Sequence, residues 1–93
     1  MPDSTRDEIA RLQEEYEKNP EGRLFVHLAE AYRRAGELEK ARDVLTQGLE
    51  RHSDYLSART VLAQVETELG EVKRALQVWR EVIELDPDNE LAL

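Results

Sequence analysis

Apolar residues recur along this chain at the three- and four-residue spacing of amphipathic helices, with polar residues between them. Ile9, Leu12 and Tyr16 share one face of a first helix, which we expect over about residues 5–18. No segment predicts a strand. The apolar positions of four further helices are Phe25, Leu28, Ala29 and Tyr32 in the second, Leu38, Ala41, Leu45, Gly48 and Leu49 in the third, Ala58, Leu62, Val65 and Leu69 in the fourth, and Val72, Ala75, Trp79, Val82 and Ile83 in the fifth.

Residues that stop a helix separate these segments. Asn19-Pro20-Glu21-Gly22 ends the first helix, and Gly36 follows the second at a point where a left-handed residue can end it. Asp86-Pro87-Asp88-Asn89 ends the fifth helix, because proline lacks the backbone donor and its ring clashes with the preceding turn. Ser4, followed three residues later by Asp7, predicts a cap at the start of the first helix.

Two of the predicted helix pairs are copies of each other. Gly36-Glu37 and Gly70-Glu71 lie 34 positions apart, with a helix before and a helix after each glycine. A unit of this size cannot bury its apolar face alone, so the copies are expected to stack. The matching residues are Leu28 with Leu62, Ala29 with Ala63, Ala41 with Ala75, Leu45 with Trp79, and Leu49 with Ile83, while Asp54 and Asp88 close the two units.

This 34-residue unit resembles the tetratricopeptide repeat, and the resemblance covers residues 22–89. The residues that match the family's pattern are Phe25, Leu28-Ala29, Tyr32, Gly36, Ala41, Leu45 and Gly48 in the first unit, and Leu62-Ala63, Gly70, Ala75, Trp79, Val82 and Pro87 in the second. The resemblance implies an all-α superhelix of antiparallel helix hairpins with about five helices. We expect an N-terminal helix in residues 1–21 that packs on the array, one repeat in 22–55, a second in 56–89, and the truncated start of a further helix in 90–93.

The sequence departs from the family's pattern at three positions. Ser53 replaces a proline, and Arg59 and Glu66 replace the early large residue and the tyrosine of the second unit. Arg59 and Glu66 are seven positions apart and share one helix face. Two interpretations are open: the charges suit a neighbour that is water or a differently built helix, or they are ordinary variation between repeats.

Small residues predict where the paired helices approach most closely. Ala29, Ala41 and Gly48 occupy such positions, since a larger side chain there would force the helices apart. We expect Ala29→Leu to destabilise the hairpin by about 1–3 kcal/mol through overpacking. Unchanged thermal unfolding of this variant would contradict a tight crossing at Ala29.

The resemblance implies a protein-interaction scaffold whose concave surface is lined by the first helix of each hairpin. The partner-binding candidates on that surface are Arg23, Val26, His27, Glu30, Arg33 and Arg34 in the first unit, and Ser57, Thr60, Gln64, Thr67 and Glu68 in the second. An alternative interpretation is that these residues only form the solvated side of amphipathic helices.

Three arginines bear on the class of partner. Arg23, Arg33 and Arg34 would make one end of the groove basic, which predicts an acidic or carboxylate-terminated peptide or protein segment. Some family members bind chaperone tails through a clamp of Lys, Asn and Arg side chains. Val26 and Glu30 stand where the Lys and Asn would be needed, so that docking is not implied.

A second functional class is self-association. The fifth helix has apolar residues that would be exposed at the end of the stack, and we expect Trp79, Val82, Ile83 and Leu85 to contact either a following repeat or an identical chain. In the first case the chain would be the N-terminal part of a longer repeat protein. In the second it would form a homo-oligomer, which light scattering across concentration would detect.

Charge and composition exclude several other partners. The net charge of −8 and the absence of a cluster of Lys and Arg oppose nucleic-acid binding. The acidic start of the chain is unlike a signal peptide and no segment approaches the length of a membrane span, so we expect no membrane association and a cytoplasmic location. The chain has no cysteine, so thiolate metal sites and cysteine nucleophiles are excluded.

The sequence offers no site for catalysis, a metal or a cofactor. The neighbouring carboxylates Glu14 and Glu15, like the Asp86-Pro87-Asp88 segment, lie on a polar face or at a helix end rather than converging in a cleft. His27 and His52 are far apart and belong to no paired-ligand motif. We therefore expect a protein that is not an enzyme and needs no cofactor.

Overall fold

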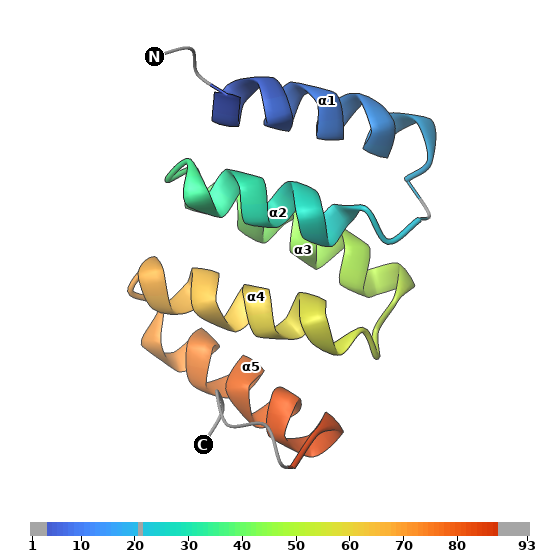
Figure 1. Cartoon of the computed structure of the whole chain (residues 1–93). Coiled ribbons are helices and arrows are strands. Elements are labelled where there is room, and N and C mark those ends of the chain that lie inside the picture. Colours follow the sequence, from blue (N-terminus) through green and yellow to red (C-terminus); the bar gives the residue numbers. More distant parts are fainter. Residues whose placement is uncertain (1–3, 21, 88–93) are drawn as a thin grey trace.

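The computed structural model describes residues 4–20 and 22–87, and this part of the chain contains five α-helices and no strand (Figure 1). The helices are α1 (Ser4–Lys18), α2 (Phe25–Arg34), α3 (Leu38–Arg51), α4 (Leu56–Glu68) and α5 (Val72–Leu85). The predicted all-α fold of antiparallel hairpins is confirmed. The structure describes the backbone of Ser4 but not the side chain that was predicted to cap α1. The predicted stop at Asp88-Asn89 and the predicted start of a further helix at 90–93 lie outside the described residues.

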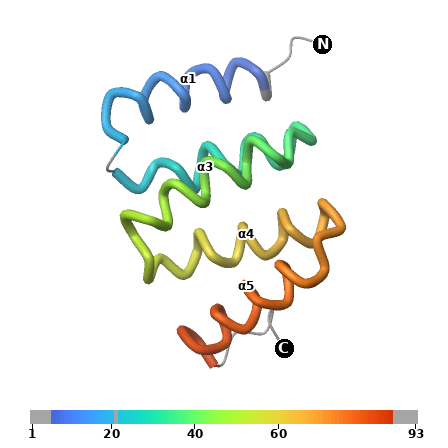
Figure 2. Tube along the Cα trace, turned by 180° about the vertical axis from the view of Figure 1, so that it is seen from behind, coloured from blue at the N-terminus to red at the C-terminus, as the bar shows by residue number. Residues whose placement is uncertain are grey.

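The five helices form a stack in which each helix packs on the next. The hairpins α2–α3 and α4–α5 follow one another, with α1 at one end and α5 at the other (Figures 1 and 2). α2 also contacts α4, whereas α3 and α5 make no close backbone contact within the described residues. The first helices of the two hairpins therefore lie closer together than the second helices, so the stack bends toward the side of α2 and α4.

The helix ends show why the two hairpins have the same shape. Gly36 and Gly70 have φ angles of 81° and 80°, a left-handed conformation that glycine adopts without steric cost. The amide of Glu37 donates to the carbonyl of Tyr32 at 2.9 Å, and the amide of Glu71 donates to the carbonyl of Glu66 at 2.9 Å. These bonds satisfy carbonyls that the helix ends leave free, and they start the following helix in the same direction in both copies.

Phe25 is the centre of the first hairpin. Its side chain is fully buried, and it contacts the rings of His52 and Tyr55 at centroid distances of 6.0 and 5.8 Å. A Cβ atom on Gly48 would lie 2.1 Å from the Cδ2 atom of this ring. Gly48 therefore allows α3 to approach Phe25, as the sequence predicted. Ala29 and Ala41 are also fully buried.

The departures at Arg59 and Glu66 each have a partner on a neighbouring helix. The guanidinium of Arg59 lies 3.0 Å from Glu81 of α5 and also donates to the carbonyl of Ser53 at 2.7 Å. Glu66 is buried, and its Oε1 atom lies 3.6 Å from Nη1 of Arg42 on α3 without forming a hydrogen bond to any described residue. The structure therefore favours the interpretation that these charges face differently built helices.

Candidate functional site

α2 and α4 together form a surface that we call the α2–α4 face, made of Glu30, Arg33, Gln64, Thr67 and Glu68. Because α2 contacts α4 directly, side chains from both repeats meet there. Four of these residues, together with Trp79 of α5, line a shallow depression of about 320 Å³. The structure thus brings together five of the predicted partner-binding residues from two units 34 positions apart.

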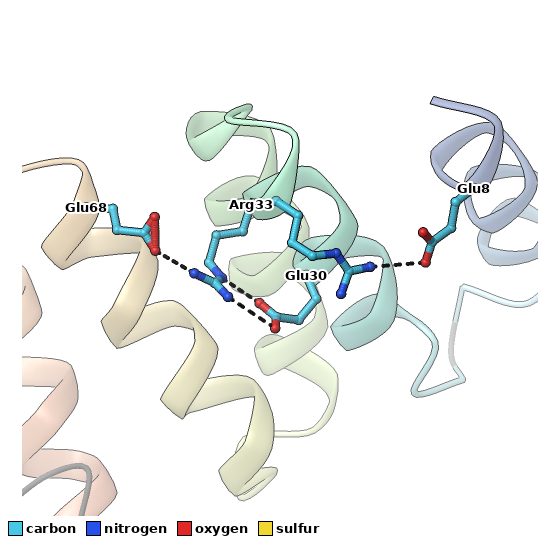
Figure 3. Close-up of polar contacts among 5 residues, drawn as sticks. Glu8, Glu30, Arg33 and Glu68 are labelled. Atoms are coloured by element: carbon cyan, nitrogen blue, oxygen red, sulfur yellow. Dashed lines mark hydrogen bonds and ion pairs between the residues drawn. The ribbon is translucent and has the colours of Figure 1, made fainter. Parts of the chain in front are cut away.

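Arg33 joins the two repeats across this face. Its Nε atom donates to Glu30 at 2.6 Å and its Nη1 atom donates to Glu68 at 2.7 Å, so it lies between a carboxylate of its own helix and one from α4 (Figure 3). The hydrogen bonds to Glu30 and then to Glu68 raise the pKa of Arg33 above its ordinary value, although partial burial opposes this effect. The guanidinium is therefore held charged and in place, and the three groups together carry one net negative charge.

The three arginines that were predicted to make one end of the groove basic all have partners within the chain. Arg34 forms an ion pair at 3.1 Å with Glu8 of α1, which lies on the opposite side of α2 from Glu68 (Figure 3). The guanidinium of Arg23 lies over the ring of Tyr55, 5.0 Å from its centroid. A ligand carboxylate must therefore compete with Glu30, Glu68 or Glu8 for Arg33 and Arg34, a constraint that spacing in the sequence could not reveal.

The other predicted candidates differ in accessibility. Val26 is 8% exposed and belongs to the core, so it offers almost no surface to a ligand. His27 and Ser57 are exposed on α2 and α4. The hydroxyl groups of Thr60 and Thr67 donate to the carbonyls of Leu56 and Ala63 in the preceding turn of α4, at 3.1 and 2.8 Å. Their hydroxyl oxygens can still accept a hydrogen bond from a ligand.

The residues predicted to contact a following repeat or another chain are only partly available. Val82 is fully buried against the rest of the hairpin, so it cannot contribute to an outer contact. Trp79 and Ile83 are half-buried and Leu85 is exposed. Val72 and Leu76 were missed as contact residues, yet they are the most exposed large apolar side chains among the described residues, at 65% and 52%.

The described residues contain no cluster of three or more side chains that could hold a metal ion. Glu14 and Glu15 are exposed and pair with Lys18 and Arg11 of the same helix. Within that same part of the chain, no helix has both the length and the apolar character needed to cross a membrane.

Known proteins share both the sequence pattern and the architecture of this chain. Two sequence profiles of the tetratricopeptide repeat (TPR) match residues 22–65 and 56–89. No curated protein matches the sequence.

Solved structures with the same arrangement include the first TPR of Spaghetti (RPAP3) bound to the HSP90 peptide SRMEEVD, with a TM-score of 0.91 and 20% identity over 96% of this chain and 71% of the other. The second TPR domain of human RPAP3, in complex with the HSP70 peptide SGPTIEEVD, gives a TM-score of 0.84 and 25% identity over 90% of this chain and 71% of the other. The first TPR domain of human RPAP3 gives a TM-score of 0.88 and 20% identity over 95% of this chain and 70% of the other.

Proposed function

Because the chain belongs to the tetratricopeptide repeat family, we propose that it is a non-catalytic module that binds a peptide or protein segment on the α2–α4 face, and that this face acts as the concave binding surface of its stack. The observation that carries this proposal is the cross-repeat contact of Arg33 with Glu68 beside the depression. Hydrogen-bonding side chains from both repeats meet there on two helices that pack directly on each other, and this arrangement suits the recognition of an extended segment.

The class of ligand that we propose is an acidic segment. The RPAP3 domains with this fold are bound to peptides that end in Glu-Glu-Val-Asp. In this chain an incoming carboxylate would replace Glu68 as the acceptor for Arg33, an exchange of one charge-assisted hydrogen bond for another. We do not extend the chaperone sequence itself to this chain, because Val26 is buried and Glu30 is already paired with Arg33.

The proposal predicts that affinity depends on the two arginines of α2. We expect the Arg33→Glu/Arg34→Glu variant to bind a labelled acidic heptapeptide with a free C-terminal carboxylate at least about tenfold more weakly than the parent chain, since two attractive charges become repulsive. Fluorescence anisotropy of the labelled peptide measures the affinity. Arg11→Glu is the control for a single charge reversal away from this face, because Arg11 pairs with Glu15 on the exposed side of α1.

Glu68→Gln tests the competition directly. Removing this negative charge frees a donor of Arg33, so we expect the acidic peptide to bind several-fold more tightly. A shuffled version of the same peptide should bind equally well, since charge rather than a chaperone sequence is recognised. Equal affinity of the Arg33→Glu/Arg34→Glu variant and the parent would refute the assignment of this face.

A further inference from the structure

Arg33 holds its two carboxylate partners unequally. Glu30 accepts hydrogen bonds from the Nε and Nη2 atoms of Arg33, at 2.6 and 3.4 Å, whereas Glu68 accepts from Nη1 alone, at 2.7 Å (Figure 3). The side chain of Glu68 is also the more exposed of the two, at 40% against 30%. An incoming carboxylate therefore displaces Glu68 from Arg33 more readily than it displaces Glu30.

This displacement would leave Glu68 without a cation. Arg33 is the only basic residue among the described residues that line the depression, and Glu68 has no second ion pair within the described part of the chain. With one carboxylate added by the ligand, the net charge of the group formed by Glu30, Arg33 and Glu68 would double from one negative charge to two. In a chain of net charge −8, this repulsion opposes a ligand that brings only negative charge.

The groups beside Glu68 suit a cation. The hydroxyl proton of Thr67 is donated to the carbonyl of Ala63 at 2.8 Å, so the oxygen of Thr67 can act only as an acceptor toward a ligand. The amide of Gln64 makes no hydrogen bond within the described chain, and its oxygen is a second acceptor. The indole of Trp79 completes the lining, and tryptophan is the aromatic side chain that attracts cations most strongly.

We propose that the ligand of the α2–α4 face has, besides its acidic group, an arginine whose guanidinium pairs with Glu68 and lies against Trp79. This inference rests on the function proposed above and adds a second recognised residue to the ligand. One internal ion pair would be exchanged for two intermolecular pairs, so the added negative charge is compensated. Arginine fits better than lysine, because its planar group donates to several acceptors and stacks on aromatic rings.

The internal ion pair also limits the spacing of the two ligand residues. Nη1 of Arg33 and Oε1 of Glu68 are 2.7 Å apart, so the ligand groups that replace them must reach neighbouring points from the same side of the ligand. In an extended segment, side chains two positions apart point to the same side and are separated by about 7 Å, whereas adjacent side chains point to opposite sides. We therefore expect the acidic residue and the arginine to be two positions apart.

Two labelled heptapeptides that differ in one side chain test the proposal. Both end in an aspartate with a free carboxylate, and the residue two positions before it is arginine in one peptide and citrulline in the other. Citrulline has nearly the shape of arginine but no charge. We expect the full chain to bind the arginine peptide at least about tenfold more tightly, as measured by fluorescence anisotropy. A third peptide, with the arginine directly before the aspartate, should lose most of this preference.

Variants assign the preference to Glu68. Glu68→Gln should bind the arginine and citrulline peptides equally, because the charge that pairs with the guanidinium is removed. Glu17→Gln is the matched control, since it makes the same change of charge at an exposed position of α1 and should keep the preference. Trp79→Leu should reduce the preference, with circular dichroism confirming that the helices are intact. Glu68→Gln decides the assignment even where Trp79→Leu unfolds the second hairpin.

Three results would overturn the proposal. The first is equal affinity of the parent chain for the arginine and citrulline peptides. This result would leave the proposed function standing if binding of both peptides is still lost in the Arg33→Glu/Arg34→Glu variant. The second is a preference for arginine that persists in Glu68→Gln, which would show only a general attraction to a chain of net charge −8. The third is the absence of binding of either peptide, which would refute the proposed function as well.

Discussion

Single residues in the two repeats compensate for one another. In the first hairpin Phe25 fills the space beside Gly48, which has no side chain. In the second, 34 positions later, Arg59 and Val82 occupy these places, and Val82 is fully buried while the guanidinium of Arg59 extends to Glu81. The ring that faces glycine in the first hairpin is thus replaced in the second by a buried valine and an arginine that forms an ion pair.

Gly48→Ala tests this packing. Alanine is favoured over glycine inside a helix by about 1 kcal/mol. However, its Cβ would lie 2.1 Å from the buried ring of Phe25, so we expect the free energy of unfolding to fall by about 1–3 kcal/mol. Urea denaturation measures the change. Gln47→Ala is the control, at an exposed neighbouring position of α3, and a stabilised Gly48→Ala variant would refute the close contact.

The sequence predicts the residues of the core better than it predicts the contacts of charged side chains. The repeated spacing identified Phe25, Gly48 and Gly36 and the roles that they have in the structure, because each role follows from local geometry. The pairing of Arg33 with Glu68 joins residues 35 positions apart. It depends on the angle between α2 and α4 and on side-chain rotamers, neither of which the spacing determines.

At the scale of helices, the interface between α3 and α4 contains a buried charge. Glu66 is 3% exposed and its nearest cation is Arg42, whose side chain is 27% exposed. In the first repeat the corresponding position is Tyr32, whose hydroxyl accepts a hydrogen bond from Gln13 of α1. The first helix of each hairpin thus makes a polar contact with the preceding helix at the same position, with different chemistry.

A double-mutant cycle tests the coupling of α3 to α4. Arg42→Met would leave Glu66 buried without its partner, which costs about 3–5 kcal/mol in comparable cases. Glu66→Met should cost less, since Arg42 can reach water. We expect the double variant to be close to the parent in the free energy of unfolding measured by urea denaturation. Simple addition of the two single effects would show that the helices are not coupled through this pair.

The order of the helices was more predictable than the exposure of the last one. Five helices and two glycine-ended hairpins follow from periodicity and repeats. The spacing also grouped Val72 and Val82 as apolar positions of the fifth helix and assigned Val82 to an outer contact, whereas Val72 is 65% exposed and Val82 is fully buried. Both are apolar residues of one helix, and only the position of the neighbouring helices decides which of its two stripes is covered.

At the scale of the whole molecule, stacking determines the surface that we assign to binding. Each helix contacts mainly its neighbours, and the contact of α2 with α4, without one between α3 and α5 in the described part, bends the stack. The bend gathers Glu30 and Arg33 with Gln64, Thr67 and Glu68 on one side. The proposed function therefore depends on the arrangement of the repeats rather than on any one residue.

Backbone amide chemical shifts of the ¹⁵N-labelled chain, titrated with the acidic heptapeptide, test the central claim most directly. We predict saturable shifts that cluster on α2 and α4, at Glu30, Arg33, Gln64, Thr67 and Glu68, and that are absent in the Arg33→Glu/Arg34→Glu variant. An unchanged spectrum at high peptide concentration, or shifts confined to α1 and the outer side of α3, would contradict binding at the α2–α4 face.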